Sequence, residues 1–405
     1  MSAPIVIRDA TLVDGTGADP RRGVDVVLES GRITRIAAGA AAPDGARVID
    51  AGGRTVMPGL SDAHVHFGLT ETSQNDAPES YVSYVLKVAE NIGIALDEGF
   101  TTVRDAGGLD PAFAEATATG QLRGPRILPA GSFISITGGH GDQRSRWRDA
   151  RERSIPGLVA RTEICDGADE VRRAARKQIR RGATQVKLMA SGGVMSPNDP
   201  IESLQFTVEE MAAAVQEARS FGLYVMAHCH TPGAMRNALD AGVRSLEHGS
   251  MMSEEIARRI TADGAFLVPT LVILEILARA EQIPEFSRRK LESVRGGIAE
   301  GMAIVRGAGV QVGSGSDLLG PRQRRRASEI VEKAKHFGAM AAIVSATRTN
   351  AALFRLEERT GTVEEGKDAD LILVDGDPLA DIGVLAQPER IVLVLKGGDV
   401  VKDAC

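Results

Sequence analysis

Cysteine is scarce in this sequence. Only three cysteines, Cys165, Cys229 and Cys405, are spread over 405 residues. Their odd number and wide spacing exclude a disulfide framework, which needs cysteines in pairs. A reducing compartment follows, and we expect a cytoplasmic protein unless a signal segment has been removed.

An excess of basic residues is also missing. The 48 Lys and Arg residues are outnumbered by 54 Asp and Glu residues, which gives a formal net charge of -6 at pH 7. Nucleic-acid-binding proteins usually carry a net basic footprint, so no nucleic acid is expected as a partner. The sequence also lacks an apolar run long enough to span a bilayer, so no membrane association is expected.

Internal repeats and low-complexity segments are absent too, which argues against a solenoid. What the chain does contain at both ends is short β-type stretches with Gly and Asp turns, such as "IVIRDATLVDG" near the start and "DADLILVDGDP" near the end. Alternating β-branched residues broken by such turns are typical of hairpins. We therefore expect residues 1–56 and 356–405 to form one small composite β-sandwich domain.

The middle of the chain, residues 57–355, alternates short apolar runs with amphipathic helical stretches, which favours βα units around a parallel sheet. Many of the helical stretches end on Gly, a common helix stop. The sequence predicts an α/β fold with a (β/α)₈ TIM-like barrel, whose functional residues lie at the carboxyl ends of its strands. The eight candidate strands lie in "TVMPGLSDAHVHF", "FTTVRDAGG", "RILPAGSFIS", "QVKLMASGG", "LYVMAHCH", "RSLEHGS", "FLVPTL" and "VQVGSGSDLL".

Histidine is rare as well, with only 7 residues, yet two of them stand on either side of one valine in "DAHVH". Alternate residues of a strand point to the same face, so His64 and His66 would project together from the end of the first barrel strand. Two imidazoles placed in this way can bind one metal ion. A pair of surface or helix-cap histidines is the alternative, so the motif needs partners elsewhere.

Such partners stand at the ends of other predicted strands. Each has an ordinary explanation when it is taken alone, such as a helix cap or an exposed lysine. Their joint placement on one rim instead indicates a site for Zn²⁺ or a related metal, because imidazole and carboxylate groups are its preferred ligands. A protonated lysine has no lone pair for a metal, but its neutral amine can react with CO₂ to give an anionic carbamate. The candidate ligands are His64, His66, Lys187, His228, His248 and Asp317.

Together, "DAHVH", "VKLMASGG", "MAHCH", "LEHGS" and "GSGSD" resemble the amidohydrolase superfamily, and "GKDADLILVDGDPL" resembles its composite β-domain. The resemblance implies two divalent ions, with zinc expected. It places His64, His66 and Asp317 on one ion, His228 and His248 on the other, and an N6-carboxylated Lys187 between them. The nucleophile would be a hydroxide held between the two metals.

The stretches "SITGGHGD" and "AHCHTPGAMRNALDAGVRSLEHGS" are most similar to the imidazolonepropionase-like branch, which includes metallo-dipeptidases, prolidases and ochratoxin-hydrolysing amidases. The resemblance implies that His140 contacts the scissile carbonyl, although it could be a loop histidine without a ligand role. His230 stands where dipeptidase relatives commonly have a tyrosine that contacts the substrate carboxylate, a departure that weakens the case for peptides. Oligomers of identical chains are expected from the same resemblance.

These residues predict metal-dependent hydrolysis of a linear amide or peptide bond next to a free carboxylate. The substrate would be a small molecule such as an N-acyl amino acid, a dipeptide or ochratoxin A. Asp317 would move the proton from water to the leaving nitrogen, and His140 would stabilise the oxyanion. Two alternatives remain, namely hydrolysis of a cyclic amide of the imidazolone type and a non-catalytic scaffold barrel.

Substrate contacts are also expected from the loops and strand ends around the rim. The stretches "RSRWRDARER" and "GPRQRRRASE" offer arginines that could bind a substrate carboxylate, and Trp147 could cover an aromatic group or anchor its loop. Apolar walls are expected from residues that could equally belong to the core: Val194, Met195, Leu271 and Ile273.

Overall fold

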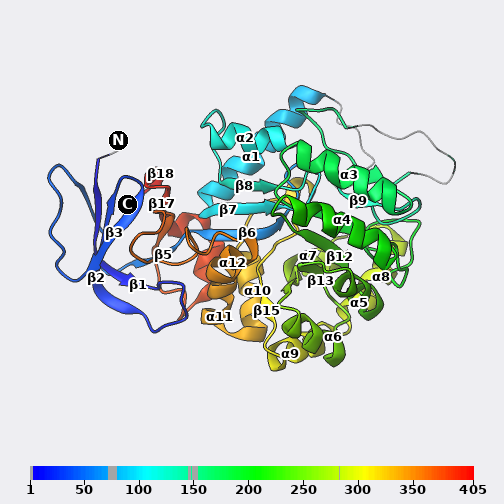
Figure 1. Cartoon of the computed structure of the whole chain (residues 1–405). Coiled ribbons are helices and arrows are strands. Elements are labelled where there is room, and N and C mark those ends of the chain that lie inside the picture. The colour runs from blue at the N-terminus through cyan, green and yellow to red at the C-terminus, as the bar shows by residue number, and fades with distance from the viewer. Residues whose placement is uncertain (1–2, 72–79, 145–146, 148–153, 282) are drawn as a thin grey trace.

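A computed structural model describes residues 3–71, 80–144, 147, 154–281 and 283–405 of the chain (Figure 1). Two parts are visible, a β-rich part that holds both termini and a larger barrel surrounded by helices. Within the described residues, no helix combines the length and apolar character needed to cross a membrane.

The β-rich part is one eight-stranded sheet assembled from both ends of the chain, as the sequence predicts. Its strands follow the order β18-β17-β16-β5-β1-β2-β3, and β4 pairs with β1. The two ends of the chain meet where β5 runs antiparallel to β16, with Met57 opposite Ile372. The strands are β1 Ile5–Leu12, β2 Arg21–Glu29, β3 Arg32–Ala37, β4 Arg47–Asp50, β5 Thr55–Pro58, β16 Leu371–Val374, β17 Ile391–Lys396 and β18 Asp399–Asp403.

This sheet curls on itself around its own core. The backbone of Ile33 in β3 exchanges hydrogen bonds with residues 366 and 367, just before β16. Side chains of β1 and β2, such as Ile7 and Val26, share one apolar cluster with Leu373 and Leu393 from the other end of the chain. The composite domain predicted from both termini is therefore confirmed, while its division from the barrel at residues 56 and 355 stays a prediction.

The barrel is formed by two parallel sheets that close on each other. One has the order β6-β7-β8 and the other β10-β9-β11-β12-β13-β14-β15. The Ala63 amide donates to the Ser314 carbonyl and the Asp317 amide to the His64 carbonyl, which joins the first strand to the end of the last. The strands are β6 Leu60–Val65, β7 Phe100–Asp105, β8 Arg126–Pro129, β9 Ile134–Ser135, β10 Glu163–Ile164, β11 Val186–Met189, β12 Val225–Cys229, β13 Ser245–His248, β14 Phe266–Val268 and β15 Gln311–Val312.

Helices pack around the barrel and begin at residues that satisfy their free amide groups. Thr207 and Glu210 form a capping box at the start of α4, and Asp110 and Thr231 cap helices that carry Pro at the first position. The helices are α1 Tyr81–Asp97, α2 Pro111–Ala118, α3 Ala168–Arg180, α4 Val208–Ser220, α5 Pro232–Asp240, α6 Glu254–Ala262, α7 Leu271–Arg279, α8 Glu285–Arg295, α9 Ile298–Gly307, α10 Ser328–Phe337, α11 Ala339–Val344 and α12 Asn350–Phe354.

Three consecutive helices, α7, α8 and α9, lie between β14 and β15, where a simple βα unit would have one. The first of them starts directly after the carboxyl end of β14. It is more apolar than a one-sided surface helix, and five of its nine residues are buried. This insertion adds a wall above the rim of the barrel, where the predicted functional residues lie.

Candidate metal centre and substrate pocket

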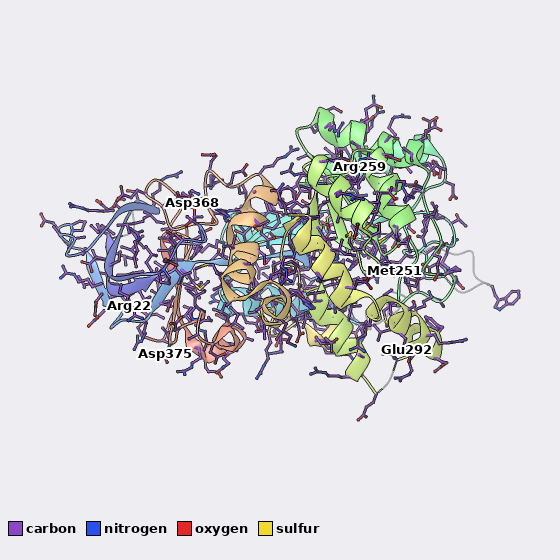
Figure 2. The ribbon with its side chains drawn as sticks, turned by 90° about the horizontal axis from the view of Figure 1, so that it is seen from below. Arg22, Met251, Arg259, Glu292, Asp368 and Asp375 are labelled. Atoms are coloured by element: carbon purple, nitrogen blue, oxygen red, sulfur yellow. The ribbon has the colours of Figure 1, made fainter. Side chains whose placement is uncertain are left out.

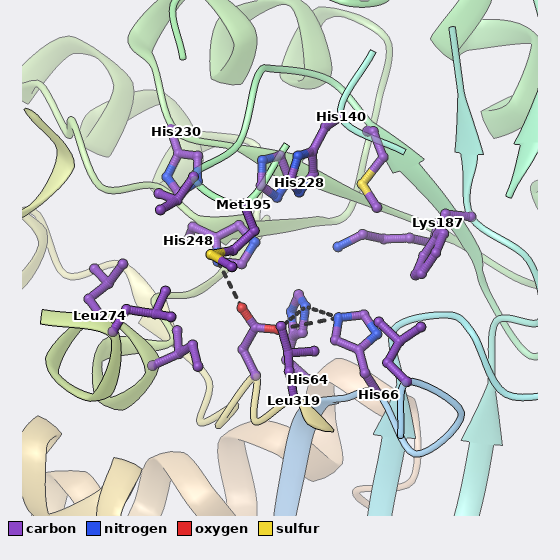
Figure 3. Close-up of a pocket in the computed structure, with 17 residues that line it drawn as sticks. His64, His66, His140, Lys187, Met195, His228, His230, His248, Leu274 and Leu319 are labelled. Carbon is purple, nitrogen blue, oxygen red and sulfur yellow. Dashed lines mark hydrogen bonds and ion pairs between the residues drawn. The ribbon is translucent and has the colours of Figure 1, made fainter. Parts of the chain in front are cut away.

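One pocket at the carboxyl ends of the barrel strands contains every predicted metal ligand and both histidines predicted to contact the substrate (Figure 3). Including its open mouth, the pocket has a volume of about 640 Å³. Side chains from five strand ends and one loop therefore meet in a single place. They are His64, His66, His140, Lys187, His228, His230, His248 and Asp317.

The closest group consists of His64, His66 and Asp317. The two histidine Nε2 atoms are 3.2 Å apart, and Asp317 Oδ1 lies 3.3 Å from Nε2 of His66 and 3.6 Å from Nε2 of His64. One potential ligand atom from each residue lies within 4.8 Å of the other two. The strand alternation expected for "DAHVH" thus places both imidazoles on the inner face of the barrel.

Three residues at the rim have backbone conformations that side chains other than glycine seldom adopt. The φ angles are 71° at His248, 49° at Thr270 and 53° at Asp317. Thr270 also contacts His248 through a 2.7 Å hydrogen bond between Oγ1 and Nδ1. Residues held in the left-handed region cost free energy and cluster at functional sites. The conformation of this rim therefore supports a role for its side chains in binding or chemistry.

A buried ion pair fixes the orientation of His64. Its Nδ1 lies 2.7 Å from Oε2 of Glu247, and Arg104 donates from Nη2 to both oxygens of the same carboxylate. Burial opposes the charge on Glu247, but Arg104, His64 and Lys187 together outweigh this effect, and the pKa of the carboxyl falls to about 2. The ionised carboxylate holds the proton of His64 at Nδ1, which leaves Nε2 free toward the pocket.

We expect Arg104→Met to destabilise the protein by about 3–5 kcal/mol, since it leaves Glu247 as a buried charge without its partner. Both side chains are completely buried. The measurement is the urea concentration at the midpoint of unfolding. Arg123→Met is the matched control, because the Arg123–Asp97 pair is about half exposed and is worth about 0–1 kcal/mol. Equal stability of the two variants would contradict this account.

The other histidines are also held by one ring nitrogen. His66 Nδ1 lies 2.7 Å from the Gly107 carbonyl oxygen, and His228 Nε2 lies 3.1 Å from the Gly192 carbonyl oxygen. A carbonyl accepts the ring proton, so the second nitrogen keeps its lone pair. Burial lowers the pKa values of His228 and His248 well below their usual range, so these rings are neutral at pH 7. Neutral, oriented imidazoles are the form in which histidine binds metals.

Lys187 reaches the centre of the pocket from β11. Burial lowers the pKa of its amine from 10.5 to about 8, although Glu247 and Asp317 favour the charged form. Within the part of the chain that the structure describes, no side chain or carbonyl hydrogen-bonds its Nζ. An amine that loses its proton this readily can react with CO₂, and the free Nζ has space for the product. The donors gathered here therefore fit a site for divalent metal, with Lys187 among them.

His140 and His230 flank His228 on the opposite wall. The ring centroids of His140 and His228 are 4.3 Å apart, and those of His228 and His230 are 4.7 Å apart. Nδ1 of His140 lies 2.8 Å from Ser196 Oγ, and Nδ1 of His230 lies 3.0 Å from Ser250 Oγ. Burial is the main cause that lowers both pKa values to about 3. Two neutral imidazoles are thus held beside the predicted metal site.

The loop after β11, which carries Ser196, is tied down by a lysine from a distant helix. Lys290 on α8 donates from Nζ to three carbonyl oxygens of this loop, those of Gly193, Ser196 and Asp199. The loop also supplies Val194 to the pocket wall. One cation therefore positions both an apolar wall of the pocket and the serine that contacts His140.

Replacing Lys290 by methionine is expected to raise KM by about tenfold or more while kcat changes less. Loss of a charged hydrogen bond costs about 1.5–3 kcal/mol, and here it frees a loop that lines the pocket rather than a reacting group. Steady-state kinetics give both constants. Lys335→Met, at an exposed lysine paired with Glu332, is the control. A fall in kcat at constant KM would contradict this positioning role.

The apolar walls agree in part with the sequence analysis. Val194, Met195 and Ile273 line the pocket as expected, whereas Leu271 packs into the core between barrel and helices. Further apolar side chains complete the walls, namely Leu69, Phe133, Met189, Leu274, Leu277 and Leu319. Five of the lining residues come from α7 and the loop after β11, so these two segments shape the space that a substrate would occupy.

The arginines do not line the pocket within the described residues. Arg144 pairs with Asp142, Arg324 pairs with Glu90, and Arg326 is buried beside Asp62. Residues 145–146 and 148–153 of the first Arg-rich stretch lie outside the described residues. Trp147 is 91% exposed, so it neither covers the pocket nor anchors its loop to the barrel. The expectation of an arginine contact to the substrate gains no support from the described arginines.

The sequence analysis did not predict the residues that hold the site in place, namely Glu247, Arg104 and Lys290. Glu247 immediately precedes His248, and Arg104 stands in the second barrel strand. A charged residue inside an apolar strand was a usable signal, because a buried charge needs a partner. Lys290 gave no such signal, since it stands on an amphipathic helix with several other charged residues.

Three comparisons with known proteins show which family the chain belongs to. The amidohydrolase family matches residues 55–401. An ochratoxinase of Aspergillus niger is 33% identical over 367 residues, which cover 86% of this chain and 75% of that protein. Its crystal structure superposes with a TM-score of 0.87 at 30% identity, over 99% of this chain and 96% of that one.

Two further solved structures are similar over the whole barrel and sheet. A prolidase in complex with N-methylphosphonate-L-proline superposes with a TM-score of 0.94 at 38% identity, over 99% of this chain and 100% of that one. A Xaa-Pro dipeptidase with methionine in its active site gives 0.89 at 32% identity, with the same coverage. Divalent metal binding is typical of the family that these proteins share with this chain. The family match, the barrel with its composite sheet and the histidine-rich rim together show that the chain is a hydrolase of the amidohydrolase family, in its imidazolonepropionase-like branch.

Proposed function

We propose that this protein is a binuclear metal-dependent hydrolase that cleaves a linear amide or peptide bond next to a free carboxylate. The observation that carries the proposal is the convergence of six ligand-type side chains and two further histidines in one pocket with apolar walls. The relatives support the bond type, because they include an ochratoxinase, a prolidase and a Xaa-Pro dipeptidase.

The proposed metal ligands are the two histidines of β6, the lysine of β11, the histidines of β12 and β13, and the aspartate after β15. Two divalent ions held there would polarise the substrate carbonyl and lower the pKa of bound water. Zinc is expected from the nitrogen and oxygen donors. The ligands are His64, His66, Lys187, His228, His248 and Asp317.

Asp317 is the proposed general base and acid. Burial raises the pKa of its carboxyl, but His64 and His66 outweigh that effect and lower it below its usual value. An ionised carboxylate at neutral pH can accept the proton of the attacking water and then donate it to the departing nitrogen. The left-handed backbone at this residue fixes the carboxylate beside the two histidines of β6.

His140 and His230 are the proposed substrate contacts. If the hydroxyl of Ser250 donates to Nδ1 of His230, then Nε2 of that ring carries the proton and can donate it to a substrate oxygen. For His140 the same tautomer requires that the Ser196 hydroxyl donate to Nδ1, 2.8 Å away, rather than to the Gly193 carbonyl oxygen, 3.2 Å away. One ring would stabilise the carbonyl oxygen as it becomes negative, and the other would bind the carboxylate beside the scissile bond.

The walls favour a substrate with an apolar or aromatic side chain. Phe133, Met189, Met195 and Leu274 all line the pocket, and Figure 3 shows Met195 and Leu274 among the side chains around it. Apolar groups of a substrate gain free energy when they leave water for such walls. N-acyl amino acids, aryl-amides such as ochratoxin A and dipeptides with an apolar residue fit this description.

The decisive experiment measures turnover of matched substrates that differ at the carboxylate. N-acyl phenylalanine, ochratoxin A, X-Pro dipeptides and ring amides form the panel, and the best free acid is compared with its methyl ester and primary amide. Faster cleavage of the free acid supports the proposal. Equal rates for the ester would contradict carboxylate recognition, and turnover confined to ring amides would establish the cyclic-amide alternative. A protein that binds no divalent metal would instead revive the scaffold alternative.

We expect His230→Ala to weaken substrate binding without loss of metal, whereas His228→Ala should lose both activity and metal. The two side chains are two residues apart and line the same pocket, but only His228 is a proposed ligand. Metal content by elemental analysis and KM by steady-state kinetics separate the two effects. If His230→Ala loses metal as fully as His228→Ala, the role assigned to His230 is wrong.

Homo-oligomer formation and a cytoplasmic location are further parts of this proposal. The oligomer is proposed from the family resemblance, and the location is proposed from the composition of the chain. Light scattering of the eluting protein over a range of concentrations tests the first, and a strict monomer would contradict it.

A further inference from the structure

A second pocket lies at the opposite end of the barrel from the metal centre. It is lined by residues that precede the strands, including Tyr224 before β12, Arg244 before β13 and Ala265 before β14. The predicted metal ligands stand at the other ends of the same strands, so the two pockets are separated by the barrel core. Including its open mouth, it has a volume of about 920 Å³. Figure 2 shows Arg259, one of its lining residues, among the helices of the barrel and away from Asp368 and Arg22 of the terminal sheet.

Four arginines from different elements meet in this pocket, which we call the arginine basin: Arg219, Arg244, Arg259 and Arg355. Three of them donate to backbone carbonyls. Arg219 donates to Gly242 over 3.3 Å, Arg244 to Ala352 over 2.9 Å, and Arg355 to Gly222. Within the part of the chain that the structure describes, none of these three forms an ion pair with a carboxylate.

Two of the guanidinium groups share one aromatic ring. The Cζ atom of Arg244 is 5.8 Å from the ring centroid of Tyr224, and that of Arg355 is 5.7 Å from the same centroid. Burial and the neighbouring Arg355 lower the pKa of Arg244, which is the sign of an unfavourable approach of like charges. An anion between the two groups would remove this repulsion, since opposite charges at such distances attract.

The acidic groups around the basin do not neutralise it. Asp263 is the only carboxylate among the described lining residues, and it pairs with Arg259 over 2.8 Å. Arg259 also pairs with Asp240, and Glu357 acts on Arg244 only at longer range. The basin is therefore positive in a chain whose formal net charge is -6. Its charge is a local feature rather than a reflection of the whole surface.

We propose that the arginine basin binds a phosphate group, either as inorganic phosphate or as part of a small phosphorylated metabolite. Guanidinium groups bind such oxyanions through paired N–H donors, and several of them favour a doubly charged phosphate over a single carboxylate. The apolar floor, which includes Val215, Leu223 and Leu239, offers a contact for the organic part of an ester. This binding site is independent of the proposed reaction.

Isothermal titration of the metal-loaded protein with inorganic phosphate, and separately with a sugar phosphate, tests the proposal at constant ionic strength in chloride. The variant Arg219→Gln/Arg355→Asn removes two charges, and asparagine tolerates the left-handed backbone of residue 355. We expect phosphate affinity to fall by roughly tenfold or more, because the variant loses two charged hydrogen-bond donors. Tighter binding of the ester than of the ion identifies a metabolite as the ligand, and the reverse identifies free phosphate.

Arg173→Gln on the exposed face of α3 is the matched control. Its phosphate affinity should differ from that of wild type by less than about twofold, because Arg173 takes part only in an exposed ion pair with Glu170. Phosphate that binds at the metal centre would inhibit turnover, and its inhibition constant should be the same in the basin variant and the wild type. The proposal is overturned if wild-type protein binds neither probe. It is also overturned if the basin variant binds both probes as tightly as wild type. The same holds if added chloride abolishes the difference in phosphate affinity between wild type and the basin variant.

Discussion

Replacing Asp317 by asparagine is expected to lower kcat by about 10³- to 10⁴-fold, the upper range for loss of a general acid–base group. The amide cannot accept the proton of the attacking water. The fold should persist, because residue 317 has φ 53° and asparagine tolerates this conformation. The measurement is kcat on the best substrate, with metal content determined on the same sample and circular dichroism as the test of folding.

The control for this variant is Asp399→Asn, at an exposed position of β18 in the terminal sheet. It makes the same chemical change far from the pocket and should leave kcat within about twofold, as expected for a surface substitution. A fully active Asp317→Asn enzyme would show that another group moves the proton. His140 would then be the next candidate, since it lines the same pocket.

Lys187→Ala is expected to abolish both activity and metal binding, and short carboxylic acids should restore part of each. The side chain is 1% exposed, so its removal leaves a closed space at the centre of the site. Formate or acetate could enter that space and supply the two oxygens that a lysine carbamate would provide. Without such a ligand the two ions have too few donors, and loss of a structural ligand set releases the metal.

Two measurements distinguish a carbamate from an unmodified lysine. Native mass spectrometry of the wild type should show the added mass of one CO₂, and Lys187→Ala should not. Removal of CO₂ during metal loading should reduce the activity of wild-type protein. Lys177→Ala, at a partly exposed lysine of α3 paired with Glu163, should behave like wild type in both measurements. If Lys187→Ala keeps two ions and is not helped by acids, the bridging role is wrong.

The positions of the site residues could be predicted because they follow simple periodic rules. Parallel barrel strands end at one rim, and alternate residues of a strand share a face, so "DAHVH" and the ends of the later strands had to meet. The composite sheet was predictable for a similar reason, since the β-type stretches at both ends lack helical periodicity. Convergence of His64 and Asp317, whose nearest nitrogen and oxygen atoms are 3.6 Å apart, follows from strand order alone.

The contacts that hold these residues could not be predicted, because they join side chains far apart in the chain. Arg104 and Glu247 are separated by 143 residues, and Lys290 lies more than 90 residues beyond the loop that it holds. Local periodicity carries no information on such pairs. The same limit explains why the prediction of Leu271 as a pocket residue was wrong. This residue stands close to pocket residues in sequence but packs into the core.

The sequence by itself determined the family, the barrel with its composite sheet and the set of residues at the rim. These depend on residue type and on spacing along single strands. Only the tertiary structure decided which ring nitrogen of each histidine faces the pocket, and that no described arginine lines it. It also decided the strained backbone at His248 and Asp317 and the meeting of four arginines at the far end of the barrel. These features depend on the packing of several elements at once, and the free energy that fixes each of them comes from partners distant in the chain.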